Sequence, residues 1–285
     1  MRKSIYSNAK INIGLNILAK KFNGYHKLDM LMVPISLADK LEINFKNIKG
    51  NLKINCDNKN IPTDEKNIIY KIYNKFYEVT QLEKEEVEIY LYKRIPSQAG
   101  LGGGSSNGAF FLKELNKYYK NILSEQNMID ISKEIGADIP FFIKNLPCRV
   151  EGIGEKLTEI KNNLEYKILL IKPDFGISTK RAYYLSDKLT DKKEANIEIL
   201  IKSLKDNNLI NLNLNNKNIL EQSLLTEDEN IINFRKKLDM LKNYNFFMSG
   251  SGSCYYSLLP KEESICIEEL KKKVGDCDIY ICNFL

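Results

Sequence analysis

A short stretch of the chain, PSQAGLGGGSSNGAFF at residues 96–111, concentrates the residues best suited to bind a phosphate group. Its glycines can adopt a positive φ and bring backbone N–H groups close to a ligand; they are Gly100, Gly102, Gly103 and Gly104. Residues 105–107, Ser-Ser-Asn, offer N-capping groups for a helix that follows. Backbone N–H groups and the positive end of a helix dipole favour an anion at one spot. The stretch therefore predicts a phosphate loop rather than a flexible turn, which would not need so many glycines.

The spacing excludes two common phosphate loops. A Walker A loop requires Gly-Lys-Ser/Thr, but Gly104 is followed by two serines. A GxGxxG loop would have its third glycine at Ser105 or Asn107, depending on where the count begins. The loop therefore belongs to another class.

Three further residues could take part in chemistry, although each has an ordinary structural interpretation. Lys10 lies on the polar face of an alternating segment, and Asp138 precedes a proline by two positions. His26, the single histidine, follows an Asn-Gly turn signal and Tyr25. From the residues alone, we would interpret Lys10 as a solvated strand residue and Asp138 as a turn residue. His26 would be an incidental packing or surface residue.

The surrounding patterns predict the elements that position these residues. Residues 9–17 alternate apolar and polar side chains, which predicts a half-buried strand. Apolar side chains recur at helical spacing over 68–79 and again over 109–119. A strand over 87–95 leads into the glycines, so the loop joins a strand to a helix. We interpret the polar stretch 205–218 as a surface connection.

Strands and helices interleave without a regular strand-helix-strand rhythm, which indicates an α+β fold. Two lobes are expected, over residues 1–155 and 156–285. A formal charge of +6 is scattered among acidic residues, which argues against nucleic-acid binding. The six cysteines form no CxxC pair, and no segment is typical of a signal peptide or a membrane span. We predict a cytoplasmic protein that binds no membrane and is a monomer or homodimer.

The segment Pro96–Gly102 resembles the glycine-rich motif of the GHMP kinase superfamily. Further segments match that superfamily in the expected order; they are residues 9–12, 23–26, 136–142, 151–155, 176–179 and 249–254. Gly108 departs from the pattern, which has alanine there, and should cost about 1 kcal/mol in a helix. The resemblance implies a two-lobed fold with the active site in the cleft between the lobes. The N-terminal lobe would resemble the ribosomal protein S5 domain 2-like fold, and the C-terminal lobe would be an α/β sandwich.

The resemblance also implies an activity: transfer of phosphate from ATP, with Mg²⁺, to the hydroxyl of a cytidine-diphospho-methylerythritol. Lys10 and Asp138 would be catalytic, and Ser105 would bind the metal. The remaining implied ATP-binding residues are Pro96, Gln98, Ala99, Gly100, Leu101, Gly102, Gly103, Gly104, Ser105, Ser106 and, in the adenine pocket, Asn67. The implied cytosine pocket consists of Asn12, Tyr25, His26 and Tyr183, for which Tyr184 is an alternative. A homoserine or mevalonate type of GHMP kinase, or a non-catalytic nucleotide-binding regulator, remains the alternative function.

Overall fold

The computed structural model describes residues 1–20 and 26–285, which form two compact units. The first unit consists of residues 1–9, 37–96 and 102–145, and the second of residues 10–36, 97–101 and 146–285. Both units draw on several chain segments because two long strands contribute to each of them, β1 (Arg2–Lys20) and β2 (His26–Lys49), which pair with each other. The division expected at residue 155 remains a prediction.

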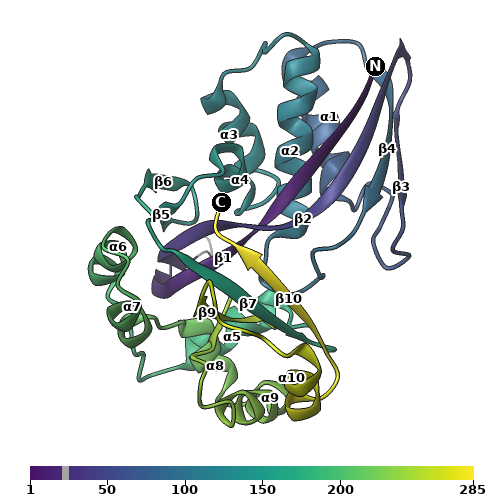
Figure 1. The fold of residues 1–285 in the computed structure, drawn as a ribbon. Helices are drawn as coiled ribbons and strands as arrows, with labels where there is room; N and C mark the ends of the chain where they lie inside the picture. Colours follow the sequence, from purple (N-terminus) through teal and green to yellow (C-terminus); the bar gives the residue numbers. More distant parts are fainter. Residues whose placement is uncertain (21–25) are drawn as a thin grey trace. The chain divides into compact units, whose positions relative to one another are not determined.

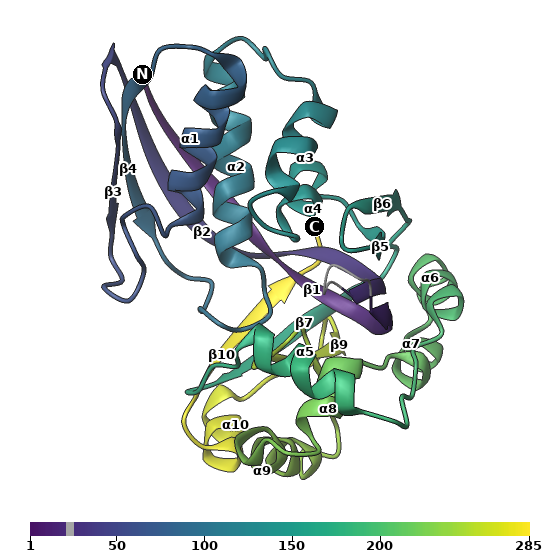
Figure 2. The same ribbon diagram turned by 180° about the vertical axis from the view of Figure 1, so that it is seen from behind.

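The first unit contains a sheet with helices over one face (Figures 1 and 2). Strand β4 pairs antiparallel with the second half of β2 and parallel with β3. The elements are β3 (Leu52–Cys56), β4 (Glu85–Tyr92), α1 (Ile68–Thr80), α2 (Gly103–Tyr118), α3 (Glu125–Lys133) and α4 (Ile139–Lys144). The apolar side chains predicted for the two helices face this core, except that Val79 is exposed.

Gly108 has a packing reason that the sequence does not reveal. A Cβ at this position of α2 would lie 2.5 Å from Cγ2 of Ile68, the first residue of α1. Such a distance requires the neighbouring side chain to move. The expected helix cost of glycine is therefore offset by the close approach of α1 to α2.

The second unit contains an antiparallel sheet in the order β10-β7-β9-β8. The elements are β7 (Tyr166–Pro173), β8 (Phe247–Met248), β9 (Tyr255–Pro260), β10 (Cys277–Asn283), α5 (Thr179–Lys188), α6 (Ile197–Lys205), α7 (Leu209–Asn215), α8 (Ile219–Leu224), α9 (Glu229–Asp239) and α10 (Ile267–Val274). The first half of β2 pairs with β5 (Cys148–Gly152), which pairs with β6 (Lys156–Glu159). Together with the first unit, this content confirms the α+β class.

Two expectations about exposure were wrong. Residues 9–17 are buried on both faces, not one, because polar groups of the second unit cover the polar face of β1. The segment 205–218 is not a plain surface connection either, since it contains α7 and the buried side chains of Asn216 and Asn218. Their amide groups bond to the backbone, as described below.

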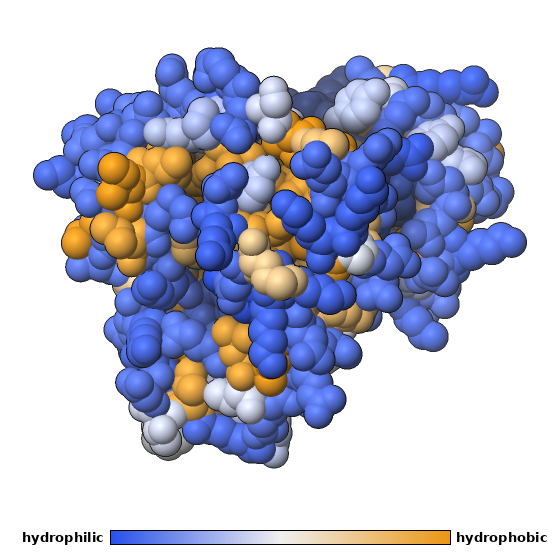
Figure 3. Space-filling view, turned by 60° about the horizontal axis from the view of Figure 1, so that its bottom comes forward, coloured by the Kyte–Doolittle hydropathy of each residue, from blue (hydrophilic) through white to orange (hydrophobic). Residues whose placement is uncertain are grey.

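The surface is mainly hydrophilic on the face shown in Figure 3, and the cysteines are not paired in disulfides. Hydrophilic residues dominate this face, and hydrophobic residues are exposed between them, most broadly in the upper part of Figure 3. All six cysteines are free, and burial raises the pKa of the Cys254 thiol far above its usual value. Among the helices in the described residues, none has the length and apolar character needed to span a membrane.

Candidate active site

The glycine-rich stretch contributes its residues 97–101 to the second unit, where Gly100 meets another backbone segment. Gly100 has a φ of 71°, and a Cβ there would lie 1.9 Å from the carbonyl oxygen of Ser249. The Ser249 hydroxyl donates to the Gly100 carbonyl at 3.0 Å. The N–H groups of Ser253 and Cys254 donate to the carbonyls of Gln98 (3.1 Å) and Ala99 (3.3 Å). The glycine-containing turn at residues 249–254 thus packs against the first loop.

Other members of the predicted loop position the backbone. Ala99 and Leu101 are buried, with 2% and 1% of their surface exposed. Gln98 has a φ of 50° and contacts Gly176, where a Cβ would lie 2.3 Å from the glutamine Oε1. Pro96 is half-buried at the end of the 37–96 segment of the first unit. The side chains of Ala99 and Leu101 therefore belong to the core, and the loop presents mainly backbone.

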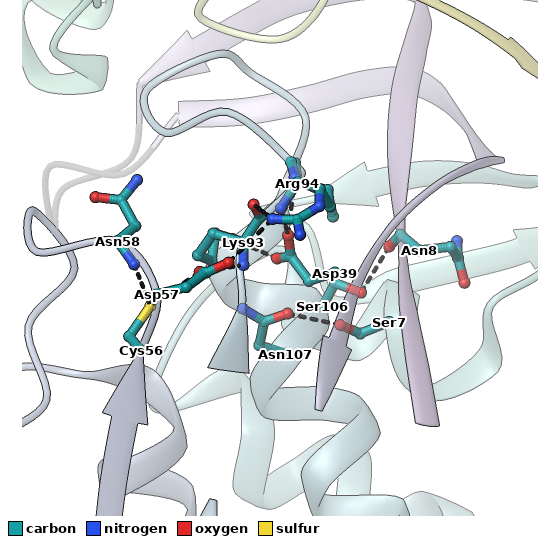
Figure 4. Close-up of polar contacts among 11 residues, drawn as sticks. Ser7, Asn8, Asp39, Cys56, Asp57, Asn58, Lys93, Arg94, Ser106 and Asn107 are labelled. Atoms are coloured by element: carbon teal, nitrogen blue, oxygen red, sulfur yellow. Dashed lines mark hydrogen bonds and ion pairs between the residues drawn. The ribbon is translucent and has the colours of Figure 1, made fainter. Parts of the chain in front are cut away.

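Helix α2 begins in the first unit without a side-chain cap. Its N-cap residue is Gly102, with φ 73° and ψ 18°, and the described residues provide no capping hydrogen bond to it. The expectation that residues 105–107 cap the helix was wrong, because glycine adopts the left-handed conformation at 102 and the helix begins at Gly103. Ser106 instead donates to the Asn8 carbonyl, and Asn107 accepts from Ser7, each at 2.6 Å (Figure 4). Neither side chain caps the helix start, and the first N–H groups of a helix have no partner within the helix, which is what an anion site requires.

A buried ion pair lies beside this helix start and was missed by the sequence analysis. The Lys93 ammonium contacts Asp39, whose side chain is fully buried (Figure 4). Asp39 also accepts from the backbone N–H groups of Arg94 (2.7 Å) and Ile95 (2.8 Å). A Cβ on Gly103 would lie 3.2 Å from the Lys93 Nζ and 2.9 Å from Ile95 Cγ2. Asp39 thus fixes the segment that leads from β4 to the loop.

Asp138 lies at the start of α4, also in the first unit. It occupies the N-cap position, yet its side chain makes no capping hydrogen bond to α4, whose residues all lie in the described chain. Gly136, two residues earlier, is close to the start of α2, since a Cβ there would lie 3.9 Å from the Ser105 hydroxyl. The other end of α4 is held by Lys113, which donates to the carbonyls of Phe142 and Ile143 at 3.0 and 2.9 Å. Burial lowers the pKa of Lys113 to about 8.

Lys10 and Asn12 lie in the second unit and are buried, with 3% of each exposed. The Lys10 Nζ donates to the Asn12 Oδ1 at 2.6 Å, and the Lys10 N–H donates to the Leu101 carbonyl at 3.1 Å. The Asn12 N–H donates to the Ser249 hydroxyl at 3.3 Å. Lys10 is therefore a buried, hydrogen-bonded cation, not a solvated strand residue.

Asparagines from the region before α8 hold this part of β1 in place. Asn216 accepts from the Gly14 N–H and donates to the Tyr256 hydroxyl, each at 2.8 Å, and that hydroxyl donates to the Asn12 carbonyl. Asn218 donates to the carbonyls of Met248 and Gly250, at either side of Ser249. Apart from the asparagine content of the segment, no sequence pattern indicates these roles.

His26 and Tyr183 come together in the second unit, which is the pairing expected for a base pocket. Their ring centroids are 5.1 Å apart, with planes at 25°. The alternative, Tyr184, is 59% exposed. Tyr25 lies outside the described residues.

Asn67 has a structural role at the start of α1. Its Oδ1 accepts from the Ile69 N–H at 2.9 Å, and its Nδ2 donates to the Pro62 carbonyl at 2.6 Å. Its nucleotide-binding role remains a prediction. Within residues 1–20 and 26–285, no group of three or more His, Cys, Asp or Glu side chains is arranged to hold a metal ion.

Comparison with known proteins identifies the class to which this architecture belongs. The model of the GHMP kinase N-terminal domain matches residues 67–145, which contain α1, the start of α2 and Asp138. The fold is shared with a crystal structure of homoserine kinase from Cytophaga hutchinsonii, at a TM-score of 0.73 and 16% identity over 99% of this chain and 95% of that one. The fold and the matched segment are those of a GHMP kinase.

More similar relatives narrow the class. The chain is 48% identical to a 4-diphosphocytidyl-2-C-methyl-D-erythritol kinase of Fusobacterium nucleatum over 98% of this chain and 96% of the relative. It is 38% identical to the kinase of that name from Clostridium tetani, over 97% and 98% of the two chains. A crystal structure of a 4-(cytidine 5'-diphospho)-2C-methyl-D-erythritol kinase superposes with a TM-score of 0.80 and 25% identity, over 98% and 99% of the chains. The chain belongs to the 4-diphosphocytidyl-2-C-methyl-D-erythritol kinase family.

Proposed function

We propose that this protein transfers the γ-phosphoryl group of ATP to the 2-hydroxyl of 4-diphosphocytidyl-2-C-methyl-D-erythritol, in the non-mevalonate route to isoprenoid precursors. The observation that carries the proposal is the 48% identity to the Fusobacterium kinase over nearly the full length of both chains. The uncapped start of α2 supports it, because a kinase must bind the phosphates of its donor.

The nucleotide phosphates would bind at the first turn of α2. The amides of Gly103, Gly104 and Ser105 follow the left-handed Gly102 and precede Ser106, whose N–H donates to the Gly102 carbonyl at 2.9 Å. Open amides and the helix dipole stabilise phosphate charge without further rearrangement. A Cβ on Gly104 would find only Ile68 Cδ1, at 3.5 Å, so the outer side of the turn has room.

Asp138 and Lys10 are the proposed catalytic residues. Asp138 would orient the substrate hydroxyl and accept its proton as the phosphoryl group transfers. Lys10, held by Asn12, would stabilise negative charge on the transferring phosphoryl oxygens. His26 and Tyr183 would bind the cytosine, through a ring nitrogen and an aromatic face.

Mg²⁺ fits this site as a companion of the nucleotide. The only protein oxygen proposed for it is the partly exposed Ser105 hydroxyl, at the same helix turn as the proposed phosphate site. When bound, the ion would neutralise charge on the β- and γ-phosphates. The amides of α2 would orient the phosphates, and Asp138 would orient the substrate hydroxyl.

Phosphorus NMR of the purified protein with MgATP tests the function. Separate samples contain 4-diphosphocytidyl-2-C-methyl-D-erythritol, mevalonate or homoserine. We expect a new phosphomonoester signal, with formation of ADP, in the cytidyl sample alone. A signal in another sample would contradict the substrate assignment while keeping the GHMP class. No signal in any sample, with ATP still bound, would favour the non-catalytic regulator.

A further inference from the structure

The single histidine of the chain has a carboxylate partner that the proposed function does not use. The His26 Nε2 lies 2.5 Å from Oδ1 of Asp187. Asp187 and Tyr183 are four residues apart on α5, so both side chains point to the same side of that helix. His26 is therefore held between an aromatic face and a carboxylate.

The partner of one ring nitrogen determines what the other can do. A carboxylate only accepts hydrogen bonds, whereas a neutral imidazole has one N–H donor and one acceptor. With Asp187 at Nε2, the proton of the neutral ring lies on Nε2, and Nδ1 becomes an acceptor. The side chains of His26 and Asp187 are 9% and 32% exposed, so water competes little at the histidine.

We propose that Asp187 is a positioning residue that, through His26, makes the protein select cytosine over uracil. The proposal rests on the proposed function, in which His26 contacts the base. Cytosine carries an exocyclic amino group where uracil carries a carbonyl oxygen. An acceptor at Nδ1 receives a hydrogen bond from the amino group but opposes the carbonyl oxygen. A mismatch of this kind leaves polar groups unpaired and is costly inside a site.

The first test reads the histidine directly and needs no activity. Because the chain has one histidine, ¹⁵N-histidine labelling gives the two ring-nitrogen signals without assignment. When the ring signals are those of the neutral imidazole, we expect the Nε2–H tautomer in the wild type. Asp187→Asn should shift the ring toward a mixture of tautomers, whereas Asp191→Asn, an exposed aspartate four residues further on, should not. A wild-type Nδ1–H tautomer, or an unchanged ring in Asp187→Asn, would overturn the proposal.

The second test measures selectivity as the ratio of kcat/KM for the cytidine substrate to that for its uridine analogue. We expect Asp187→Asn to lower this ratio at least tenfold, chiefly through the KM of the cytidine substrate, and Asp191→Asn to leave it unchanged. An equal loss for both substrates, or an unchanged ratio, would contradict the selectivity role. If the wild type phosphorylates neither substrate, the proposed function fails, while the tautomer result still reports on the Asp187 contact.

Discussion

Helices α1 and α2 lie in the same unit, but their N-termini are built differently. At α1, the Asn67 side chain accepts from the Ile69 amide, as a stabilising cap does. At α2, the N-cap residue is the left-handed Gly102, which has no side chain to cap the helix. This difference supports the proposal that the first amides of α2 bind phosphate, because a helix whose start is only structural can use a side-chain cap, as α1 does.

Helices α3 and α4 repeat this contrast. Ser124 and Asn127 form a capping box at α3, whereas Asp138 occupies the N-cap position of α4 without capping it. An aspartate is among the best capping residues, so its carboxylate is directed elsewhere at some cost in helix stability. Among the four helices α1–α4 of the first unit, the two without a side-chain cap are those that carry the proposed phosphate site and the proposed base.

The largest expected effect comes from Asp138→Asn. The substitution keeps the shape of the side chain but removes the proton acceptor, so we expect kcat to fall about 10³-fold with little change in ATP affinity. Steady-state kinetics and calorimetric titration with ATP measure the two quantities. Asp130→Asn, on the exposed side of α3, is the matched control. A rate near that of the wild type would remove Asp138 from the catalytic role.

Gly104→Asp should have opposite effects on stability and on binding. A carboxylate in the first turn favours the helix dipole by about 0.3–1 kcal/mol, and the position has room for a Cβ. The same charge repels phosphate, which we expect to weaken ATP binding about 100-fold. Gly104→Asn supplies the same shape without the charge and should bind ATP nearly normally. Equal affinities of the two variants would mean that phosphate does not bind at this turn.

Lys113 makes the stability of the unit containing α4 depend on pH. Burial lowers its pKa from 10.5 to about 8, so the unfolded chain binds more protons between these values. The cost of burying the charge is fully present below pH 8, and the free energy of unfolding rises as the pH increases toward 10.5. Relative to Lys113→Met, we expect a gain on the order of 2 kcal/mol over this window. Denaturant unfolding at several pH values measures it, and a constant difference would contradict the assignment.

Asn67→Ala should have the smallest effect, lowering the free energy of unfolding by about 1 kcal/mol through loss of the cap. Asn67→Ser keeps an acceptor and should recover most of the loss. Thermal or denaturant unfolding provides the comparison. If ATP affinity falls in the serine variant while stability is retained, Asn67 also contacts the nucleotide; if stability is unchanged in the alanine variant, the capping role is wrong.

The features predicted correctly from the sequence are those that depend on residues close together in the chain. Helical spacing located α1 and the body of α2, and the glycines located the loop, because these features depend on neighbouring residues. The same pattern placed the cap of α2 three to five residues too late, since a left-handed Gly102 competes with serine caps and local propensity does not decide between them.

Long-range contacts could not be predicted in this way. Lys10 is buried because residues beyond position 200 cover its strand, and one of them, Asn216, is 202 residues from its partner Gly14. Asp39, in the middle of β2, accepts a hydrogen bond from the backbone N–H of Arg94, 55 residues away. The identities of these residues carry no periodic signal, so their roles emerge only from the tertiary structure.

The most direct measurement of the contrast between α1 and α2 is a titration of glycine-, serine- and isoleucine-labelled protein with a non-hydrolysable ATP analogue, followed by amide NMR. We predict large, saturable shifts of the Gly103, Gly104 and Ser105 amides, while the Ile69 amide, bonded to Asn67, stays in place. Unchanged α2 amides in protein saturated with the analogue would contradict the assignment of this helix start to phosphate binding.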